Sequence, residues 1–119
     1  MYNKIQDDNG DDAKLEVVTL ACGLVGGETI LPHVPSTVEV ICSQITGNLF
    51  GYYHGLRFIQ EVLGSIPIVH IDDVCEAHIF CMENPSVNGR YLCSVAKTSS
   101  RDIALYFAEH FPEFKIDER

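Results

Sequence analysis

Short strand-like and helix-like runs alternate along this chain, and the alternation constrains the fold more than any other feature. Residues 15–20 (LEVVTL) are nearly all apolar and rich in β-branched side chains, as in a buried strand of a parallel sheet. Residues 66–71 (IPIVHI) and 90–95 (RYLCSV) predict two more strands, and Pro67 favours a sheet edge or the start of its strand. Helix-type periodicity fills the intervals, so the sequence predicts an α/β fold.

Three helices are predicted, and each begins at a residue that can cap free backbone amides. They cover residues 36–47, 73–84 and 99–111. The expected capping residues are Ser36 or Thr37, Asp73 in a capping box with Glu76, and Ser99. Residues 56–63 could form a further short helix, although the glycines around them obscure the pattern.

A glycine-rich segment, residues 21–27 (ACGLVGG), separates the first strand from the first helix. Its glycines allow a sharp turn and a close approach of the backbone to a ligand. It is not a phosphate loop, because it lacks the Gly-x-Gly-x-x-Gly spacing and no Lys-Ser/Thr pair follows it. We therefore expect a connecting loop here.

Charge and hydropathy limit the partners of the chain. Its 119 residues carry a formal net charge of −9, which disfavours nucleic acid and anionic lipid. No apolar stretch approaches the roughly 20 residues that cross a bilayer, and the acidic first residues do not resemble a secretory signal. The expectation is a cytoplasmic protein without membrane insertion, in which residues 1–14 form an acidic, mobile lead-in.

The five cysteines are expected to be reduced, because an odd number without a secretory signal does not suit a disulfide framework. Most of them lie in apolar runs, where cysteine packs as a small hydrophobe. A Cys-His nucleophile built on Cys22 or Cys75 is conceivable, but no spacing selects a histidine partner. Buried structural cysteines are the better interpretation.

Residues 70–81 contain every ligand type of a zinc site. On a helix, however, Cys75, His78 and Cys81 would fan across the surface rather than converge, since each advances three residues. The chain also has no Cys-x-x-Cys pair. We expect no metal here, and favour a capped junction between a strand and a helix.

Four segments taken in order resemble the downstream half of the plant dihydroflavonol reductase and anthocyanidin reductase group of extended short-chain dehydrogenases. They are LEVVTLACGLVGG, VPSTVEVICSQITGN, IPIVHIDDVCEAHIFCMENP and GRYLCS. The resemblance covers residues 15–114. It implies the C-terminal, substrate-side part of an NAD(P)-binding Rossmann-type fold over residues 15–119, without the upstream dinucleotide-binding half.

The resemblance also implies roles for individual residues. Those implied to contact NADP are Ala21, Cys22, Gly23 and Leu24, below the nicotinamide half, and Ser36, at a phosphate. Pro35 would line a flavonoid pocket. No catalytic residue and no metal ligand is carried over. The motif around His70 is implied to close the small domain back onto the sheet.

The chemistry of such a reductase is expected to be missing from this chain. The family needs a tyrosine followed four residues later by a lysine, which together protonate the developing alkoxide, and no Tyr-x-x-x-Lys occurs here. Tyr53 with Arg57 is the nearest match, but arginine stays charged and cannot transfer a proton. The resemblance places the catalytic pair and the glycine-rich βαβ unit upstream of residues 15–20.

Two hypotheses about function follow. The first is a fragment of an NADPH-dependent oxidoreductase of the flavonoid reductase type, which contributes the substrate pocket and part of the cofactor site and is inactive alone. The substrate of the full-length protein would be a small, flavonoid-like molecule. The second is a non-catalytic module derived from that fold, which binds a small ligand or a protein. Exposed sheet surface and self-association would favour the first, and a self-sufficient core the second.

Overall fold

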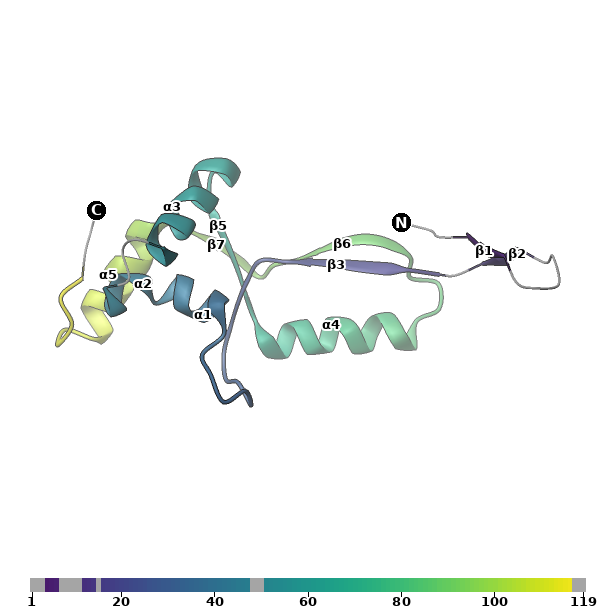
Figure 1. Ribbon diagram of the computed structural model, residues 1–119, viewed down its shortest axis with the longest axis horizontal. Helices are drawn as coiled ribbons and strands as arrows, with labels where there is room; N and C mark the ends of the chain where they lie inside the picture. The colour runs from purple at the N-terminus through teal and green to yellow at the C-terminus, as the bar shows by residue number, and fades with distance from the viewer. Residues whose placement is uncertain (1–3, 7–11, 15, 48–50, 117–119) are drawn as a thin grey trace.

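The computed structural model describes residues 4–6, 12–14, 16–47 and 51–116, and forms an elongated α/β structure (Figure 1). Its principal extents are 64 × 27 × 25 Å and its radius of gyration is 18.7 Å, against about 13–14 Å expected for a compact chain of this length. The N-terminal strands β1 (Lys4–Gln6) and β2 (Asp12–Lys14) pair as an antiparallel hairpin at one end. The mobility of residues 1–14 stays a prediction.

A two-stranded parallel sheet forms the half of the molecule next to this hairpin. Strand β3 (Val18–Cys22) pairs in register with β6 (Gly89–Cys93). Helix α4 (Ile71–Glu83) runs along this sheet, and side chains from α4, β3 and β6 together line a cavity of about 420 Å³. The sheet is therefore covered by one helix on one face.

A three-stranded sheet with four helices forms the other half. Its strand order is β4 (Leu24–Gly26), β5 (Ile66–His70), β7 (Ala96–Thr98), with β4 parallel and β7 antiparallel to β5. The helices around it are α1 (Ser36–Ile41), α2 (Ser43–Thr46), α3 (Tyr52–Leu63) and α5 (Ser100–His110). None of the helices in the described part of the chain is long and apolar enough to span a bilayer.

The core lies in this second half, between α3, α5 and β5. Leu56 of α3 and Ile66 of β5 are fully buried, with 0% of their surface exposed. Tyr53, Ile103 and Phe107 complete the buried cluster. Burying a large aliphatic side chain contributes about 1.5–3 kcal/mol, so these contacts account for much of the stability of this half.

The first strand departs from its prediction in position and burial. Strand β3 begins at Val18 and extends to Cys22, and its residues are half-buried or exposed rather than buried. Its described pairing is with β6 alone, on one edge. A strand of a parallel sheet is normally covered on both faces, so β3 has the sequence of an interior strand in a more exposed position.

The predicted loop over residues 21–27 is also wrong, because most of this segment is strand. The chain leaves β3 at Cys22 and enters β4 at Leu24, so Gly23 alone carries it from one sheet to the other. A Cβ atom on Gly23 would lie 2.7 Å from the backbone oxygen of Pro67. Glycine is required here for this close approach, rather than for a turn.

The helices agree with prediction at several boundaries and differ at others. The Ser99 hydroxyl caps α5 by accepting a hydrogen bond from the Asp102 amide at 3.1 Å, as predicted. At α4 the predicted Asp73 cap is wrong, because the helix starts at Ile71 and the His70 ring caps it. Helix α1 starts after Pro35 without any side-chain cap, contrary to the prediction for Ser36 or Thr37.

Two features around α3 and β5 were only partly anticipated. Helix α3 begins at Tyr52, four residues before the predicted start, and runs through Gly55 to Leu63. Pro67 lies at the second position of β5, as a strand start predicts, but β5 is the central strand of its sheet and not an edge.

Large apolar side chains remain exposed over both halves. They include Leu92 on β6, which is 72% exposed, and Phe58 on α3 at 64%. Exposed apolar side chains that gather into a large patch mark a contact site for a protein, a membrane or a ligand. Self-association through the exposed sheet stays a prediction.

Substituting the glycine at the sheet crossing tests its role. Gly23→Ala is expected to lower the free energy of unfolding by about 1–3 kcal/mol, because the backbone of Pro67 cannot yield to the added methyl group. Urea denaturation followed by circular dichroism measures the change.

Gly55→Ala is the matched control for this substitution. Nothing lies within 4 Å of a Cβ built on Gly55 inside α3, so alanine should raise stability there by about 0.5–1 kcal/mol. If Gly23→Ala and Gly55→Ala changed the free energy of unfolding equally, the close approach of Pro67 would not explain the glycine at position 23.

Candidate functional site

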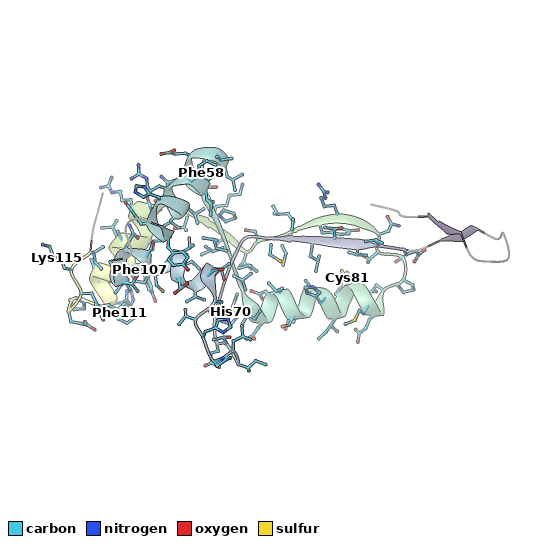
Figure 2. The ribbon with its side chains drawn as sticks, viewed as in Figure 1. Phe58, His70, Cys81, Phe107, Phe111 and Lys115 are labelled. Atoms are coloured by element: carbon cyan, nitrogen blue, oxygen red, sulfur yellow. The ribbon has the colours of Figure 1, made fainter. Side chains whose placement is uncertain are left out.

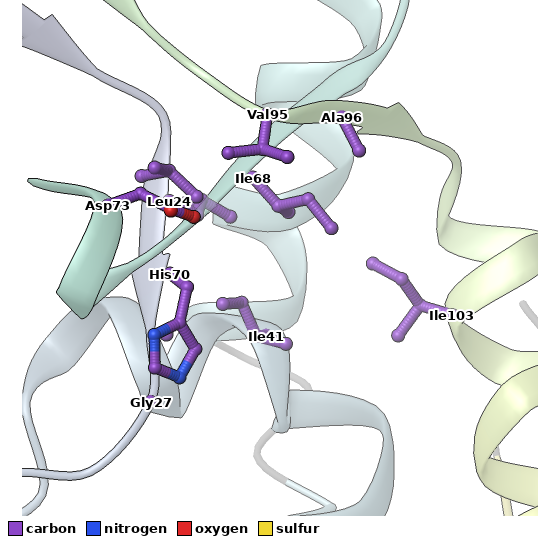
Figure 3. Close-up of a pocket in the computed structure, with 11 residues that line it drawn as sticks. Leu24, Gly27, Ile41, Ile68, His70, Asp73, Val95, Ala96 and Ile103 are labelled. Carbon is purple, nitrogen blue, oxygen red and sulfur yellow. The ribbon is translucent and has the colours of Figure 1, made fainter.

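A cavity of about 360 Å³ opens where the parallel strands β4 and β5 end (Figure 3). Ligands of open α/β sheets bind outside the carboxyl ends of the strands, so this is the position at which a site is expected. Ile103 reaches toward the cavity from α5, on the side opposite His70. The lining is almost entirely apolar and consists of Leu24, Gly26, Gly27, Ile41, Ile68, Val69, His70, Asp73, Val95, Ala96 and Ile103.

Two polar side chains, His70 and Asp73, contribute to the wall of this cavity. His70 is held at the junction of β5 and α4, because its Nδ1 accepts a hydrogen bond of 3.2 Å from the Asp72 amide. The Asp72 carboxylate lies 3.5 Å from the same nitrogen. Apolar walls with few fixed polar groups favour a largely apolar ligand that makes one or two directional contacts.

A second cavity, of about 440 Å³, lies next to β4 and shares Gly26 and Gly27 with the first. Its walls come from the segment between β4 and α1, from α1 and from the first turn of α4. Gly27 has a φ of +117°, and a Cβ atom there would lie 2.7 Å from Nε2 of His70. Gly27 therefore allows the chain to pass close to the His70 ring between the two cavities.

The six residues implied to form the site lie on both sides of β4. Leu24 lines the first cavity and Pro35 lines the second. Ala21 and Cys22 are exposed at the end of β3, and Gly23 forms the crossing. Ser36 is the exposed first residue of α1, a helix of only six residues. The structure thus does not bring the six into one cavity, and their roles stay predictions.

The main polar residues of the first cavity were not predicted from the sequence as site residues. His70 was expected to act structurally and Asp73 to cap α4, whereas both line the cavity. Their position was a usable signal, since His70 ends β5 and Asp73 follows three residues later, and the ends of parallel strands define the site in such sheets. The apolar wall formed by Ile41, Ile103 and Val95 arises from non-local packing and had no signal in the sequence.

Neither Tyr52 nor Tyr53 at the start of α3 resembles the activated tyrosine of a reductase. Tyr53, the nearest match to the family motif, is 7% exposed and packs in the core. A hydrogen bond with Glu39 and the charge of that carboxylate raise the pKa of the neighbouring Tyr52 phenol. A phenol that assists proton transfer near neutral pH needs its pKa shifted in the opposite direction.

The potential zinc ligands within residues 70–81 do not converge on one point in the structure. Figure 2 places His70 at the start of α4 and Cys81 far along the same helix. His78 contacts the backbone instead, with its Nδ1 2.7 Å from the Val74 oxygen. No group of three or more metal-ligating side chains occurs within the part of the chain that the structure describes.

The interpretation of Cys22 and Cys75 as buried structural cysteines is wrong. Both side chains are exposed, and all five cysteines are free thiols. Cys42 does fit that interpretation, because it packs against the core and burial raises the pKa of its thiol.

Comparisons with known proteins found related sequences and a related structure. A candidate anthocyanidin reductase of Ginkgo biloba is 43% identical over 108 residues, which span 89% of this chain and 31% of that protein. The dihydroflavonol 4-reductase of Zea mays is 31% identical over 105 residues, or 88% of this chain and 27% of its own length. The crystal structure of vestitone reductase from alfalfa superposes with a TM-score of 0.66 at 28% identity, over 86% of this chain and 30% of that one. No family model matches the chain.

The predicted resemblance to the anthocyanidin reductase and dihydroflavonol reductase group is confirmed. The predicted α/β fold of a Rossmann-type extended short-chain dehydrogenase is confirmed. The group consists of NAD(P)-dependent reductases. The chain spans only about three tenths of the length of the relatives it matches.

Substitutions of His70 test whether its ring stabilises the junction between β5 and α4 by capping the helix. His70→Ala should destabilise the start of α4 by about 1 kcal/mol, because the Asp72 amide loses its acceptor. His70→Asn should retain most of the stability, since asparagine is among the preferred capping residues. Thermal unfolding followed at 222 nm compares the three proteins, and an asparagine variant as unstable as the alanine variant would show that the ring acts through packing instead.

Proposed function

We propose that this chain is the substrate-side part of a flavonoid-type, NADPH-dependent reductase and does not turn over substrate alone. In this proposal residues 15–119 provide the pocket for a small, flavonoid-like molecule and part of the nicotinamide and phosphate site. Activity would require the remaining part of the fold, since the matched relatives are about three times as long as the matched segment.

The observation that carries the proposal is the apolar cavity where β4 and β5 end. Its volume of about 360 Å³ lies within the roughly 300–1,000 Å³ of small-molecule sites. Flat aromatic molecules bind through apolar walls, which Ile68, Val95 and Ile103 supply, with orientation left to a few polar groups such as His70 and Asp73. The names of the relatives, which refer to anthocyanidins and dihydroflavonols, support a flavonoid-like ligand.

The cofactor proposal rests on residues that flank this cavity. Leu24 lines it, and Ala21, Cys22 and Gly23 lead into it from β3. Ser36 and Pro35 begin α1 next to the adjoining cavity. A nicotinamide held beside Leu24 would lie against a ligand in the first cavity, as hydride transfer requires. The NADP would bind to a partial site here, and the rest of its contacts would come from outside this chain.

A non-catalytic binding module is the alternative, and one observation favours it. The buried cluster of Leu56, Ile66 and Phe107 draws only on residues of the half that contains the first cavity. This half could therefore fold and bind a small apolar ligand with no contribution from β3 and β6. If the 119-residue chain is monomeric and binds a flavonoid but does not bind NADPH, the binding-module hypothesis is supported.

Cofactor binding without turnover is the first test of the proposal. Purified 1–119 should show no NADPH-dependent loss of absorbance at 340 nm with a dihydroflavonol or an anthocyanidin. NADPH at a hundred times its dissociation constant should stabilise the chain by about 2.7 kcal/mol, a rise in melting temperature on the order of 10 °C. Turnover by the chain alone would refute the inactivity, and an unchanged melting temperature would refute the partial cofactor site.

Blocking the cavity from β7 is the second test, with dihydroquercetin as the probe. Ala96 lines the cavity and the next residue, Lys97, is exposed and does not line it. Ala96→Phe should weaken binding of the probe by at least tenfold, on the order of 1.4 kcal/mol, because the ring would occupy the space of the ligand. Lys97→Phe adds the same ring at the next position of the strand and should leave affinity unchanged in calorimetric titration. Equal affinities for the two variants would place the ligand elsewhere.

A further inference from the structure

Two cysteines lie directly opposite one another on neighbouring strands. Cys22, the last residue of β3, and Cys93, the last residue of β6, are register partners in the parallel ladder. Neighbouring strands are about 4.8 Å apart, which is within the roughly 4.4–6.8 Å between the Cα atoms of a disulfide. The amide of Gly23 donates a 3.0 Å hydrogen bond to the Cys93 oxygen and fixes this register where the strands end.

The two thiols share one face of the sheet. Opposite residues of a parallel ladder project to the same side, and side chains repeat every second residue along a strand. Leu20 and Tyr91, also register partners and two residues earlier, both line the cavity in front of α4, as do Cys93 and the largely exposed Leu92. Cys22 is exposed whereas Cys93 is half-buried, so Cys22 is the more accessible thiol of the pair.

The electrostatics of Cys93 agree with a close thiol pair. Partial burial raises the pKa of the Cys93 thiol, and the neighbouring Cys22 thiol and the Asp73 carboxylate raise it further. Cys93 is therefore a protonated thiol near neutral pH, and it must lose its proton before it can attack another sulfur. The contact from Cys22 is consistent with two sulfur atoms facing each other.

We propose that Cys22 and Cys93 form a dithiol site that small-molecule disulfides, such as oxidised glutathione, convert to an intramolecular disulfide. The Cys22 thiolate attacks one sulfur of the reagent, whose other sulfur leaves as a thiolate. The Cys93 thiolate then attacks the Cys22 sulfur and displaces the second reagent thiolate. The two protein thiols are oxidised, the reagent disulfide is reduced to two thiols, and these take up both protons.

The site follows from the register of β3 and β6, and does not depend on the proposed reductase function. It differs from the other cysteines of the chain, because Cys75 and Cys81 lie on α4 and Cys42 packs beside the core. A bridge between Cys22 and Cys93 would tie the first sheet together at its junction with the cavity-bearing half.

Disulfide mapping of the 119-residue chain tests the proposal. After incubation with oxidised glutathione under native conditions, the free thiols should fall from five to three, and digestion without reductant should yield one cross-linked peptide pair containing Cys22 and Cys93. The same reaction in urea should scramble the pairing over all five cysteines, because the register is then lost.

Serine variants separate the two roles within the pair. In Cys93→Ser, the Cys22 thiol should accumulate as a stable mixed disulfide with glutathione, since no second thiol resolves it. In Cys22→Ser, the half-buried Cys93 should remain reduced at least tenfold longer than Cys22 does in the first variant. Cys75→Ser, the control at another exposed thiol, should form the native bridge at an unchanged rate. A bridge to another cysteine, or glutathione retained on Cys22 while Cys93 is present, would overturn the proposal.

Discussion

The chain changes sheets twice at one place, and the rest of the structure depends on this crossing. Gly23 carries β3 into β4, and Ser94 and Val95 carry β6 into β7. The two crossings are joined by backbone hydrogen bonds of 3.0 Å, from the Gly23 amide to the Cys93 oxygen and from the Val95 amide to the Ile68 oxygen. Because Pro67 leaves no room for a side chain at Gly23, the strands can pass only with glycine there.

This crossing also explains which features the sequence predicted and which it did not. The strand at residues 66–71, the Ser99 cap and the end of α2 at Gly47 depend on local preferences, and they occur where expected. The segment over residues 21–27 was taken for a loop, because its pairing partners on β5 and β6 are about 45 to 70 residues away and no local pattern reveals them. Tertiary pairing here overrides the turn tendency of glycine.

The candidate site shows the same division between local and non-local information. Leu24 and Pro35, which the family resemblance singled out, do line cavities, because Leu24 begins β4 and Pro35 directly precedes α1. The resemblance did not reveal that β4 divides them. His70 combines a cap and a cavity wall, since one ring nitrogen serves the Asp72 amide while the ring packs beside Gly27. A single sequence position rarely indicates two such roles.

The two halves of the molecule differ in how well their apolar surface is covered. The half with β4, β5 and β7 buries a core between α3 and α5, whereas the half with β3 and β6 has helix cover from α4 on one face and leaves Leu92 largely exposed. Apolar surface on a parallel sheet is stable when a second layer covers it. Under the proposed function, a further part of the fold would supply that layer, since the matched relatives extend well beyond this segment. The dinucleotide-binding part of that proposed reductase would then cover the exposed face of β3 and β6, and the same contact would complete the cavity beside them.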